Sequence, residues 1–487
     1  MKRVNYNQLK NRGIFIYSFL YCGLLGCNTE KKDTTTPNVL LICVDDLNTF
    51  IGCMGYEHVK TPNIDRLASQ GVLFSNAHAQ APLSGPSRAS VMTGLRPSTT
   101  GIYGQINDDS IMNALPVKDQ ITFLPQYFSE HGYKTMGIGK IFHNHAPKNL
   151  FDLSGGRIKG FGPRPENNKH FRWNKKGTAT DWGAFPNEDA DMPDYQSAQW
   201  AIEQLNSEHS KPFFLAVGFL RPHVPWYVPQ KWFDIYDTDE ITTPPYYPDD
   251  FDDIPEIAYR IDDLPMFPST SWAKETGEWK NIIHAYLACI TFVDHYIGQL
   301  LDALEKSPYA KNTIVVLWSD NGYRVGEKGK FAKHCLWKEG TQVPLLFKGP
   351  GIPEGKTVKK PTELLSIYPT LLELCNLPKN KHNEGKSLLP LINDPDSPWD
   401  HAAITTWGFK NHSVTTDQFR FIQYEDGSEE LYDHQNDPNE WYNITASGEY
   451  EDLLKELRKL LPQLNRPWAR QSSYTINKYF TTTSTSK

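Results

Sequence analysis

Acidic and amide side chains follow two apolar runs of the sequence at the points where the runs end. Asp45 and Asp46 come directly after the run NVLLICV, and Asp320 and Asn321 follow a second such run. Carboxylate and amide oxygens are the ligands that Ca²⁺ or Mg²⁺ prefers in proteins. If both runs are strands of one sheet, these side chains predict a site for a hard divalent cation. Either pair alone is more typical of a solvated loop or turn.

A second group of side chains carries positive charge or a transferable proton. Its members lie on separate segments, each beside the end of an apolar run or beside a turn at Ser84: Arg88, Lys140, His143, His223 and Lys333. Singly, each is typical of an ordinary surface charge. Brought together, they would bind a tetrahedral oxyanion and move protons to and from a reacting ester.

The turn at Ser84 lies in the stretch QAPLSGPSRASVMTG, residues 80–94. Gly and Pro favour turns, and Ser is a common helix cap, so the stretch alone predicts a capped helix. The free amides at a helix N-terminus also favour anions. The same turn would therefore suit an anionic substrate if the cationic group converges on it.

Four apolar runs are predicted to be buried strands, at residues 38–44, 133–139, 212–219 and 313–319. Amphipathic helical patterns lie between them, at residues 61–71, 122–132, 195–208 and 282–307. This alternation predicts an α/β fold with a large doubly wound sheet, mainly parallel or mixed, sandwiched by helices. Ligands bind such sheets outside the carboxyl ends of the strands, where all of these polar groups would lie.

Composition and pattern indicate how the rest of the 487-residue chain is organised into loops and domains. Residues 144–195 and 225–280 lack a clear period and are predicted to be long loops that carry specificity. We expect a catalytic domain at residues 38–398, and short alternating segments predict a smaller α+β domain with an antiparallel sheet at 399–470. Residues 471–487 are expected to be a tail, disordered at its end.

The N-terminus has the pattern of a targeting segment. Basic residues precede an apolar run that is too short for a comfortable membrane span and ends in Leu24-Leu25-Gly26-Cys27. This ending resembles a bacterial lipobox, which implies a signal peptide at 1–26, lipidation of Cys27 and a polar tether at 27–37. The expected location is the bacterial cell envelope, lipid-anchored and either periplasmic or at the cell surface. The alternative is a plain secretory signal.

Charge and cysteine usage exclude some classes of protein. The formal net charge of −7 argues against a broad nucleic-acid surface, so an anionic substrate needs a local basic pocket. Outside the targeting segment, five cysteines lie far apart: Cys43, Cys53, Cys289, Cys335 and Cys375. Their odd number and wide spacing predict neither a disulfide framework nor a zinc site.

The stretch PLSGPSRASVMTG resembles the signature of type I sulfatases in the alkaline phosphatase superfamily. Other segments match that family in the same order, from about Pro37 to beyond Leu391: NVLLICVDDLN, TPNIDRLASQGVLFSNAHAQ, GKIFHNH, RPHVPW, SDNGYRVGEKGKFAKH and LWKEGTQVPLLFKGPG. Within the family, KIFH, FFLAVGFLRPHVP and GEKGKFAK are similar to iduronate-2-sulfatase and its bacterial relatives.

The resemblance implies a modified residue. In the family, the first residue of the signature is oxidised to formylglycine, and here that residue is Ser84. A serine implies an anaerobic-type radical maturase, for which Pro86 and Arg88 belong to the recognition sequence. One hydroxyl of the hydrated aldehyde would bind Ca²⁺ or Mg²⁺ and attack sulfur. The resemblance also implies the remaining cation ligands: Asp45, Asp46, Asp320 and Asn321.

The resemblance further assigns roles in turnover. Lys140 and Lys333 would hold sulfate oxygens, although Lys328, Lys330 and Lys338 lie close enough in sequence to replace Lys333. Of the remaining residues, His223 would protonate the leaving sugar alcohol and His143 would deprotonate the second hydroxyl so that sulfate is eliminated. Arg88 would orient the formylglycine.

The expected enzyme is therefore a sulfuric ester hydrolase whose partner is a sulfated oligosaccharide. We expect exo-acting 2-O-desulfation of uronic acid residues in glycosaminoglycan fragments. Arg221, His145 and Tyr323 flank the motifs, either in contact with the sugar or in solvated loops. Alternatives are an algal polysaccharide sulfatase acting on ulvan or carrageenan, a phosphatase or phosphodiesterase of the same superfamily, and a carbohydrate-binding lipoprotein without catalysis.

Overall fold

The four predicted strands lie next to one another in one mixed sheet of nine strands. Their order is β8 (Thr313–Ser319), β1 (Asn38–Asp45), β6 (Phe213–Pro222) and β3 (Lys134–Gly139), and all four are parallel. Their carboxyl ends therefore meet at one edge of the sheet, as the alternating pattern predicts. The rest of the sheet comprises β2 (Val72–His78), β4 (Leu153–Gly156), β9 (Gln342–Lys348), β10 (Lys356–Val358) and β11 (Thr362–Glu363).

The computed structural model describes residues 36–115, 121–158, 160–166, 170–171 and 180–485. The expected signal peptide, the lipidated Cys27 and most of the tether lie outside these residues. In this part of the chain, no helix combines the length and the apolar character that a membrane crossing requires.

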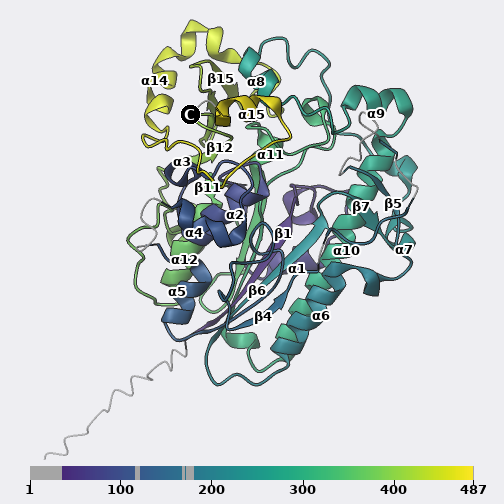
Figure 1. Cartoon of the computed structure of the whole chain (residues 1–487), viewed down its shortest axis with the longest axis vertical. Helices are drawn as coiled ribbons and strands as arrows, with labels where there is room; N and C mark the ends of the chain where they lie inside the picture. Colours follow the sequence, from purple (N-terminus) through teal and green to yellow (C-terminus); the bar gives the residue numbers. More distant parts are fainter. Residues whose placement is uncertain (1–35, 116–120, 159, 167–169, 172–179, 486–487) are drawn as a thin grey trace, which may run out of the picture. The chain divides into compact units, whose positions relative to one another are not determined.

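Strand β1 separates two hydrophobic cores because its side chains alternate between the faces of the sheet. Leu40 and Ile42 face a core that includes α1 (Pro62–Ser69), α6 (Pro193–Leu205) and α10 (Trp279–Lys306). Val39 and Leu41 face the other core, to which the following helices contribute: α2 (Ser84–Thr93), α5 (Leu124–Glu130) and α12 (Ile367–Leu374). The central strands are thus covered on both faces, as Figure 1 shows, and this explains their almost continuous apolar sequences.

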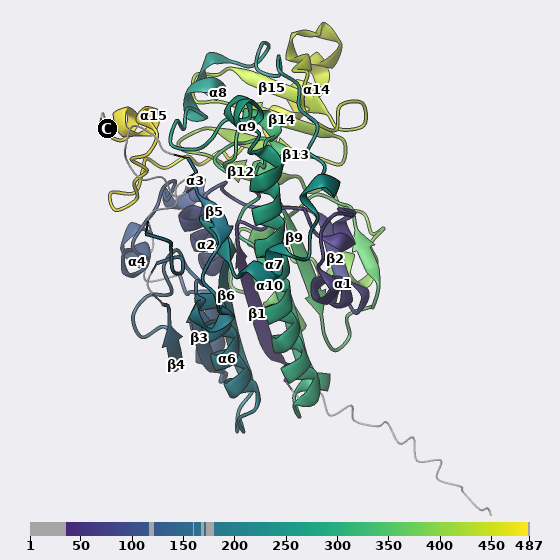
Figure 2. The same ribbon diagram turned by 90° about the vertical axis from the view of Figure 1, so that its right-hand side faces the viewer.

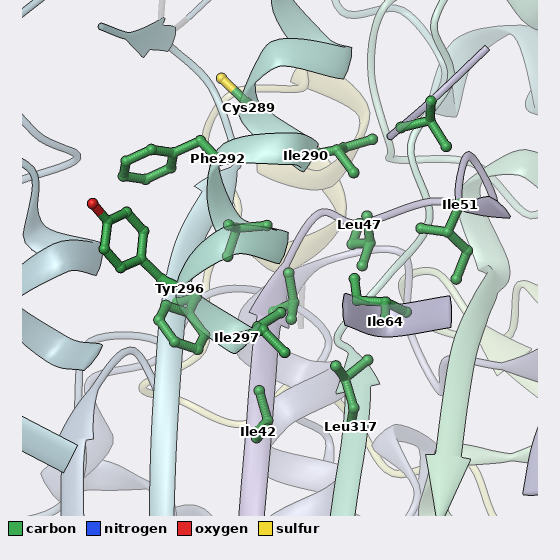
Figure 3. Close-up of a cluster of buried hydrophobic side chains, with 14 of the residues drawn as sticks. Ile42, Leu47, Ile51, Ile64, Cys289, Ile290, Phe292, Tyr296, Ile297 and Leu317 are labelled. Atoms are coloured by element: carbon green, nitrogen blue, oxygen red, sulfur yellow. The ribbon is translucent and has the colours of Figure 1, made fainter. Parts of the chain in front are cut away.

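Helix α10 is the principal cover of its face and runs beside α6 across the sheet (Figure 2). Ile290 and Ile297 of this helix are seven residues apart; Ile297 lies at the end of the strand that carries Ile42, and Ile290 points toward Leu47 in the segment that follows (Figure 3). They belong to the same core as Ile42 of β1 and Leu317 of β8, which are register partners. Burying each such side chain contributes about 1.5–3 kcal/mol, so this core holds the strand ends firmly in place.

Strands β2 and β9 are the longest of the five strands of this sheet that the sequence analysis does not identify. Strand β9 runs antiparallel to both β2 and β8, so the sheet is mixed rather than wholly parallel. Pro344 within β9 removes a backbone donor and obscures the pattern of a central strand.

A second sheet follows in the C-terminal part of the chain. It is antiparallel, and its order is β12 (Ala403–Thr406), β13 (His412–Thr415), β14 (Phe419–Gln423) and β15 (Glu429–Asp433). Helix α14 (Glu451–Lys459) packs Leu454 and Leu457 against this sheet. The predicted antiparallel sheet is confirmed, whereas the domain boundary at 398/399 stays a prediction.

The expected loops contain short elements. Residues Trp182–Ala184 (β5) and Trp226–Val228 (β7) form a small parallel sheet. The remaining α-helices are α3 (Pro97–Thr100), α4 (Ile111–Ala114), α7 (Gln230–Phe233), α8 (Glu256–Ile261), α9 (Thr270–Thr276), α11 (Lys338–Thr341), α13 (Leu389–Asn393) and α15 (Lys478–Thr485).

The expectation that residues 471–487 form a tail needs correction. Residues 472–477 pack against the catalytic half of the chain, where Gln105 and Ser473 exchange two backbone hydrogen bonds of 2.8 and 2.9 Å. Helix α15 follows directly. Polar composition suggested a tail, but long-range backbone pairing orders this segment.

A buried carboxylate joins the two sheets. Glu363 of β11 is 0% exposed and accepts two hydrogen bonds from Arg96, at 2.6 and 2.8 Å. It also accepts the amide of Ile404 in β12 at 2.9 Å and contacts His401 at 2.8 Å. Burial opposes its charge, but Arg96 and the His401 hydrogen bond hold the pKa of Glu363 at about 2. The side chain is therefore ionised in the folded protein.

We expect Glu363→Gln to lower the free energy of unfolding at neutral pH by about 3–5 kcal/mol, because it leaves Arg96 without its charged partner. The folded pKa lies below the unfolded value of about 4.3, so this stability is present above that pH and is lost as pH falls toward 2. Urea unfolding of both proteins from pH 7 down to the acid limit of folding measures the difference, which should shrink below about pH 4.3. The exposed Glu203→Gln of α6 is the matched control, and a constant difference across this range would contradict the assignment.

Candidate active site

The carboxyl end of β1 places two carboxylates inside the protein. Asp45 and Asp46 are both 0% exposed. Asp46 has φ 62°, a left-handed conformation that costs a non-glycine residue about 1–3 kcal/mol. The neighbouring backbone stabilises this turn, because the Asp46 amide donates to Asp320 at 3.1 Å and its carbonyl accepts the Tyr286 hydroxyl at 2.7 Å.

Ser84 begins α2 and lies among these charges. Its Oγ donates to Asp45 Oδ1 at 3.2 Å and lies 3.4 Å from Lys140 Nζ and 3.1 Å from Lys333 Nζ. The ammonium groups in turn bind the two aspartates: Lys140 bonds to Asp45, and Lys333 bonds to Asp46 at 2.5 Å. Groups from four distant segments of the chain thus meet at this hydroxyl.

Arg88 is one turn along α2 from Ser84 and is 0% exposed. Its Nε donates to Asp320 at 2.7 Å, and its Nη2 lies 3.5 Å from Asp45. It also donates to the backbone carbonyls of Lys140 and Ile141. This guanidinium therefore ties the ends of β8, β1 and β3 to the helix that carries Ser84.

The neighbouring lysines in the sequence lie elsewhere. Lys328 pairs with Asp250 at 2.6 Å, and Lys330 pairs with Asp262 at 3.3 Å. Lys338 donates to the carbonyl of Pro438. Of the four candidate lysines in this stretch, only Lys333 contacts Ser84 in the described structure.

The donor set fits a divalent cation. Suitable oxygen or nitrogen atoms of Asp45, Asp46 and His223 all lie within 4.8 Å of one another. Asp46 Oδ2 and Asn321 Oδ1 are buried and have no hydrogen-bond partner among the described residues. Asp320 is 0% exposed beside them. Such a concentration of buried oxygens, two of them unsatisfied, is suited to Ca²⁺ or Mg²⁺.

Burial and neighbouring charges shift the pKa values of the two aspartates in opposite directions. Burial opposes ionisation of Asp45, but Lys140 and His223 hold its pKa well below the ordinary value. Burial raises the pKa of Asp46 to about 6 despite the attraction of Lys333. Burial likewise lowers the pKa of Lys140 to about 8 against the pull of Asp45. Asp46 is thus the carboxylate that gains most from an added cation.

The two predicted proton-transfer histidines lie on opposite loops. The ring of His223 stacks on Phe161 at 4.3 Å, its Nδ1 lies 2.6 Å from the carbonyl of Val224, and its Nε2 lies 3.7 Å from Asp46. The contact with a carbonyl makes Nδ1 the donor and directs Nε2 toward the cluster. Burial, with Lys140, lowers the pKa of His143 to about 3, so this ring is neutral.

The three residues expected either at the sugar or in solvated loops differ in their positions. Arg221 is 0% exposed, and its guanidinium donates to the carbonyls of Phe161, His223 and Tyr227 at 2.8–3.3 Å. It therefore holds the loops around His223 rather than facing solvent. His145 contacts the Gly139 carbonyl and Ser154, and Tyr323 is 1% exposed.

Two cavities adjoin the cluster. One, of about 270 Å³, is lined by Asp46, His223 and Lys333 and also by Ser473–Ile476. The other, of about 400 Å³, is lined by His143, His145 and Arg157 and by neighbouring loop residues. The ring of Phe161 lines the second cavity and stacks on His223 of the first, so the linings of the two cavities are in contact here.

Several residues around the site have no distinctive pattern in the sequence. Gln105 accepts the amide of Gly85, the residue after Ser84, at 3.0 Å. The guanidinium of Arg157 lies 5.1 Å from the centre of the Phe161 ring. The C-terminal residues at the first cavity lie about 390 positions after Ser84. Only tertiary contacts reveal them, because none belongs to a periodic segment or a motif.

Comparisons with known proteins agree with this geometry. The sulfatase family model matches residues 37–377, and the C-terminal model of N-sulphoglucosamine sulphohydrolase matches residues 326–467. A sulfatase from Formosa agariphila is 53% identical over 95% of this chain and 95% of its own. Human iduronate 2-sulfatase is 33% identical, covering 73% of this chain and 72% of its own.

Two more distant comparisons concern sugar specificity and fold. A Δ4,5-hexuronate-2-O-sulfatase from Bacteroides thetaiotaomicron is 29% identical, covering 90% of this chain and 91% of its own. A solved structure in complex with its substrate, D-glucosamine-2-N,6-O-disulfate, is 24% identical with a TM-score of 0.69, covering 88% of this chain and 97% of its own. The latter likeness confirms the α/β architecture.

We expect the purified protein to contain one tightly held Ca²⁺ or Mg²⁺ per chain and Asp45→Asn to lose it, because the substitution removes a buried anionic ligand. Elemental analysis of dialysed protein measures the metal, with circular dichroism as the check on folding. Asp294→Asn is the matched control: Asp294 is equally buried, but it binds backbone amides of α1. Stoichiometric zinc without Ca²⁺ or Mg²⁺, or full retention of metal by Asp45→Asn, would contradict the site.

Proposed function

The chain belongs to the sulfatase family and is a sulfuric ester hydrolase, and we propose that its substrate is a 2-O-sulfated uronic acid at the end of a glycosaminoglycan fragment. The observation that carries hydrolysis is the position of Ser84. Its hydroxyl lies within 3.4 Å of two buried ammonium groups and a carboxylate, beside oxygens suited to a divalent cation. This is a site for an anionic ester with a nucleophile at its centre.

The proposed cofactors are Ca²⁺ or Mg²⁺ and formylglycine derived from Ser84, which together would supply an activated hydroxyl and polarise the sulfate ester. Asp45, Asp46, Asp320 and Asn321 would hold the cation. Lys140 and Lys333 each lie within 3.4 Å of Ser84 Oγ, so they can bind sulfate oxygens on either side of the nucleophile. Arg88 keeps the start of α2 and the strand ends in register.

Proton transfer is assigned to the two histidines. Because Nδ1 of His223 donates to Val224, Nε2 faces the first cavity and can protonate the departing sugar oxygen when the ring is the imidazolium. Burial holds the pKa of His223 well below its ordinary value, and the negative charge of a bound sulfate ester would favour the protonated ring. His143 is neutral and lies in the second cavity, so it can accept the proton whose removal accompanies release of sulfate. His223 also lies within reach of the metal ligands, which makes a ligand role the competing assignment.

Two observations support the choice of sugar. The relatives that are 33% and 29% identical are named as 2-sulfatases of iduronate and of unsaturated hexuronate. The second cavity is lined by Arg157, His143 and His145, and Arg157 gives it a positive charge that suits the carboxylate of a uronic acid.

Maturation and location complete the proposal. A serine at position 84 implies an anaerobic-type maturase, and the N-terminal pattern implies a lipid anchor at Cys27. The enzyme would then act in the bacterial cell envelope on oligosaccharides, at the membrane surface or in the periplasm. These statements rest on the sequence pattern, since residues 1–35 lie outside the described part of the chain.

A panel of defined sulfated disaccharides tests the proposed substrate. Enzyme coexpressed with an anaerobic-type maturase should show a Ser84 peptide that has lost two hydrogens, and it should remove the 2-O-sulfate of terminal uronic acids faster than 6-O- or N-sulfate. A phosphate ester with a matched leaving group should react much more slowly. Faster cleavage of ulvan or carrageenan fragments, or full activity with an unmodified serine, would overturn the proposal.

The role of His223 can be separated from that of a metal ligand. If His223 protonates the leaving alcohol, His223→Ala should lose about 10²–10⁴-fold in kcat/KM on the sulfated sugar and much less on nitrophenyl sulfate, whose phenolate leaves without help. Its metal content should match that of the wild type. His143→Ala should instead accumulate enzyme-bound sulfate with either substrate. Equal losses on both substrates, or loss of metal from His223→Ala, would rule out the acid role.

A further inference from the structure

The C-terminal wall, which we define as residues 472–477, is joined through Gln105 to the helix that carries Ser84. Ser473 exchanges hydrogen bonds of 2.8 and 2.9 Å with Gln105, and the side chain of Ser472 accepts the Gly104 amide at 2.9 Å. Gln105 in turn accepts the amide of Gly85 at 3.0 Å. Two residues thus connect the wall to the position after Ser84.

Two glycines, Gly104 and Gly85, make this close approach possible. A Cβ on Gly104 would lie 2.5 Å from the backbone of Ser473, and one on Gly85 would lie 2.3 Å from the side-chain oxygen of Gln105. Contacts that close exclude any larger residue unless the backbone shifts. The absence of a side chain at Gly104 and Gly85 therefore allows the backbone of Ser473 and the side chain of Gln105 to come this close.

The far end of the wall is anchored as firmly. The side-chain amide of Asn477, which is 1% exposed, donates to the carbonyls of Arg260, Ile261 and Asp263 at 2.9–3.2 Å. Between the two anchors, the ring of Tyr474 packs at 5.4 Å from His334, the residue after Lys333. Both ends and the middle of the wall are therefore held by contacts with distant segments of the chain.

The exposed side chains of the wall face the first cavity. Ser473, Tyr474, Thr475 and Ile476 line it together with Asp46, His223 and Lys333. Ile476 is 45% exposed and lines this cavity, so its apolar side chain is accessible to a ligand there. None of the residues from Gln471 to Ile476 carries a charge. The wall therefore offers hydroxyls and an apolar surface beside a catalytic cluster that is highly charged.

We propose that the C-terminal wall is the part of the substrate site that recognises the sugar ring next to the scissile sulfate. In this assignment, which rests on the proposed function, Ile476 packs on the apolar face of the pyranose, and the hydroxyls of Ser473 and Thr475 bond to its ring hydroxyls. Charge recognition belongs to the second cavity and to the catalytic lysines. The wall begins after residue 467, where the C-terminal family match ends, so it is suited to setting the specificity of this chain.

Two substitutions at exposed positions test the wall. Thr475→Val removes a hydroxyl with little change of shape, and we expect a loss of about 2- to 10-fold in kcat/KM on the sulfated sugar, seen mainly in KM. Ile476→Ala should lose about 10-fold on the sugar. Leu464→Ala, another exposed apolar residue of the C-terminal part, is the matched control and should show no loss. Formylglycine and metal content are measured first and should equal those of the wild type.

The decisive readout is the ratio of kcat/KM between two sugars that share the sulfate position and differ in the ring. A residue that contacts the ring changes this ratio, whereas a structural defect lowers both rates equally. A wild-type preference for another sulfated sugar overturns the proposed substrate only, and the ratio is then measured on that sugar and its ring isomer. Unchanged ratios in both variants, or an equal loss on sugar and nitrophenyl sulfate, would overturn the proposed role of the wall.

Discussion

The charges buried at the end of β1 must be compensated, and the rest of this structure depends on that constraint. Asp45 and Asp46 have no access to solvent, and an ionised carboxylate in that position costs several kcal/mol unless cations and hydrogen-bond donors surround it. Lys140, Lys333 and Arg88 supply that surrounding from three other segments. Each of these groups is itself buried, so no member of the cluster can be removed without leaving another uncompensated.

This mutual dependence also prepares the site for chemistry. Charges that are held in a dry, preformed arrangement interact more strongly than they would in water and need no reorganisation when charge develops on a substrate. Arg88 shows that some charged groups serve the arrangement itself. Its donors bind Asp320 and two backbone carbonyls and not a ligand. The buried residues of both hydrophobic cores make the strand ends rigid enough to maintain these distances.

Hydrogen bonds join the C-terminal part of the chain to the segments that carry this cluster. Glu363 ties the second sheet to the first through Arg96 and Ile404, and the C-terminal residues return to Gln105, which binds the amide next to Ser84. The cavity at Asp46 and His223 therefore has walls from both halves of the chain. The charged groups of this cavity and its uncharged C-terminal residues thus come from different parts of the sequence.

The sequence alone determined the parallel strands and the residues at their ends, because buried strands have continuous apolar runs and ligands lie at carboxyl edges. The family motifs, which can be recognised from neighbouring residues alone, also placed Ser84, Asp45 and Lys333 in one predicted site. Tertiary structure decided what depends on contacts between distant segments: the antiparallel β9, which Pro344 obscures, the structural use of Arg221, and the path of residues 472–477. Backbone pairing and close approach at Gly104 have no periodic signal in a sequence, so the wall beside the nucleophile became visible only in the folded chain.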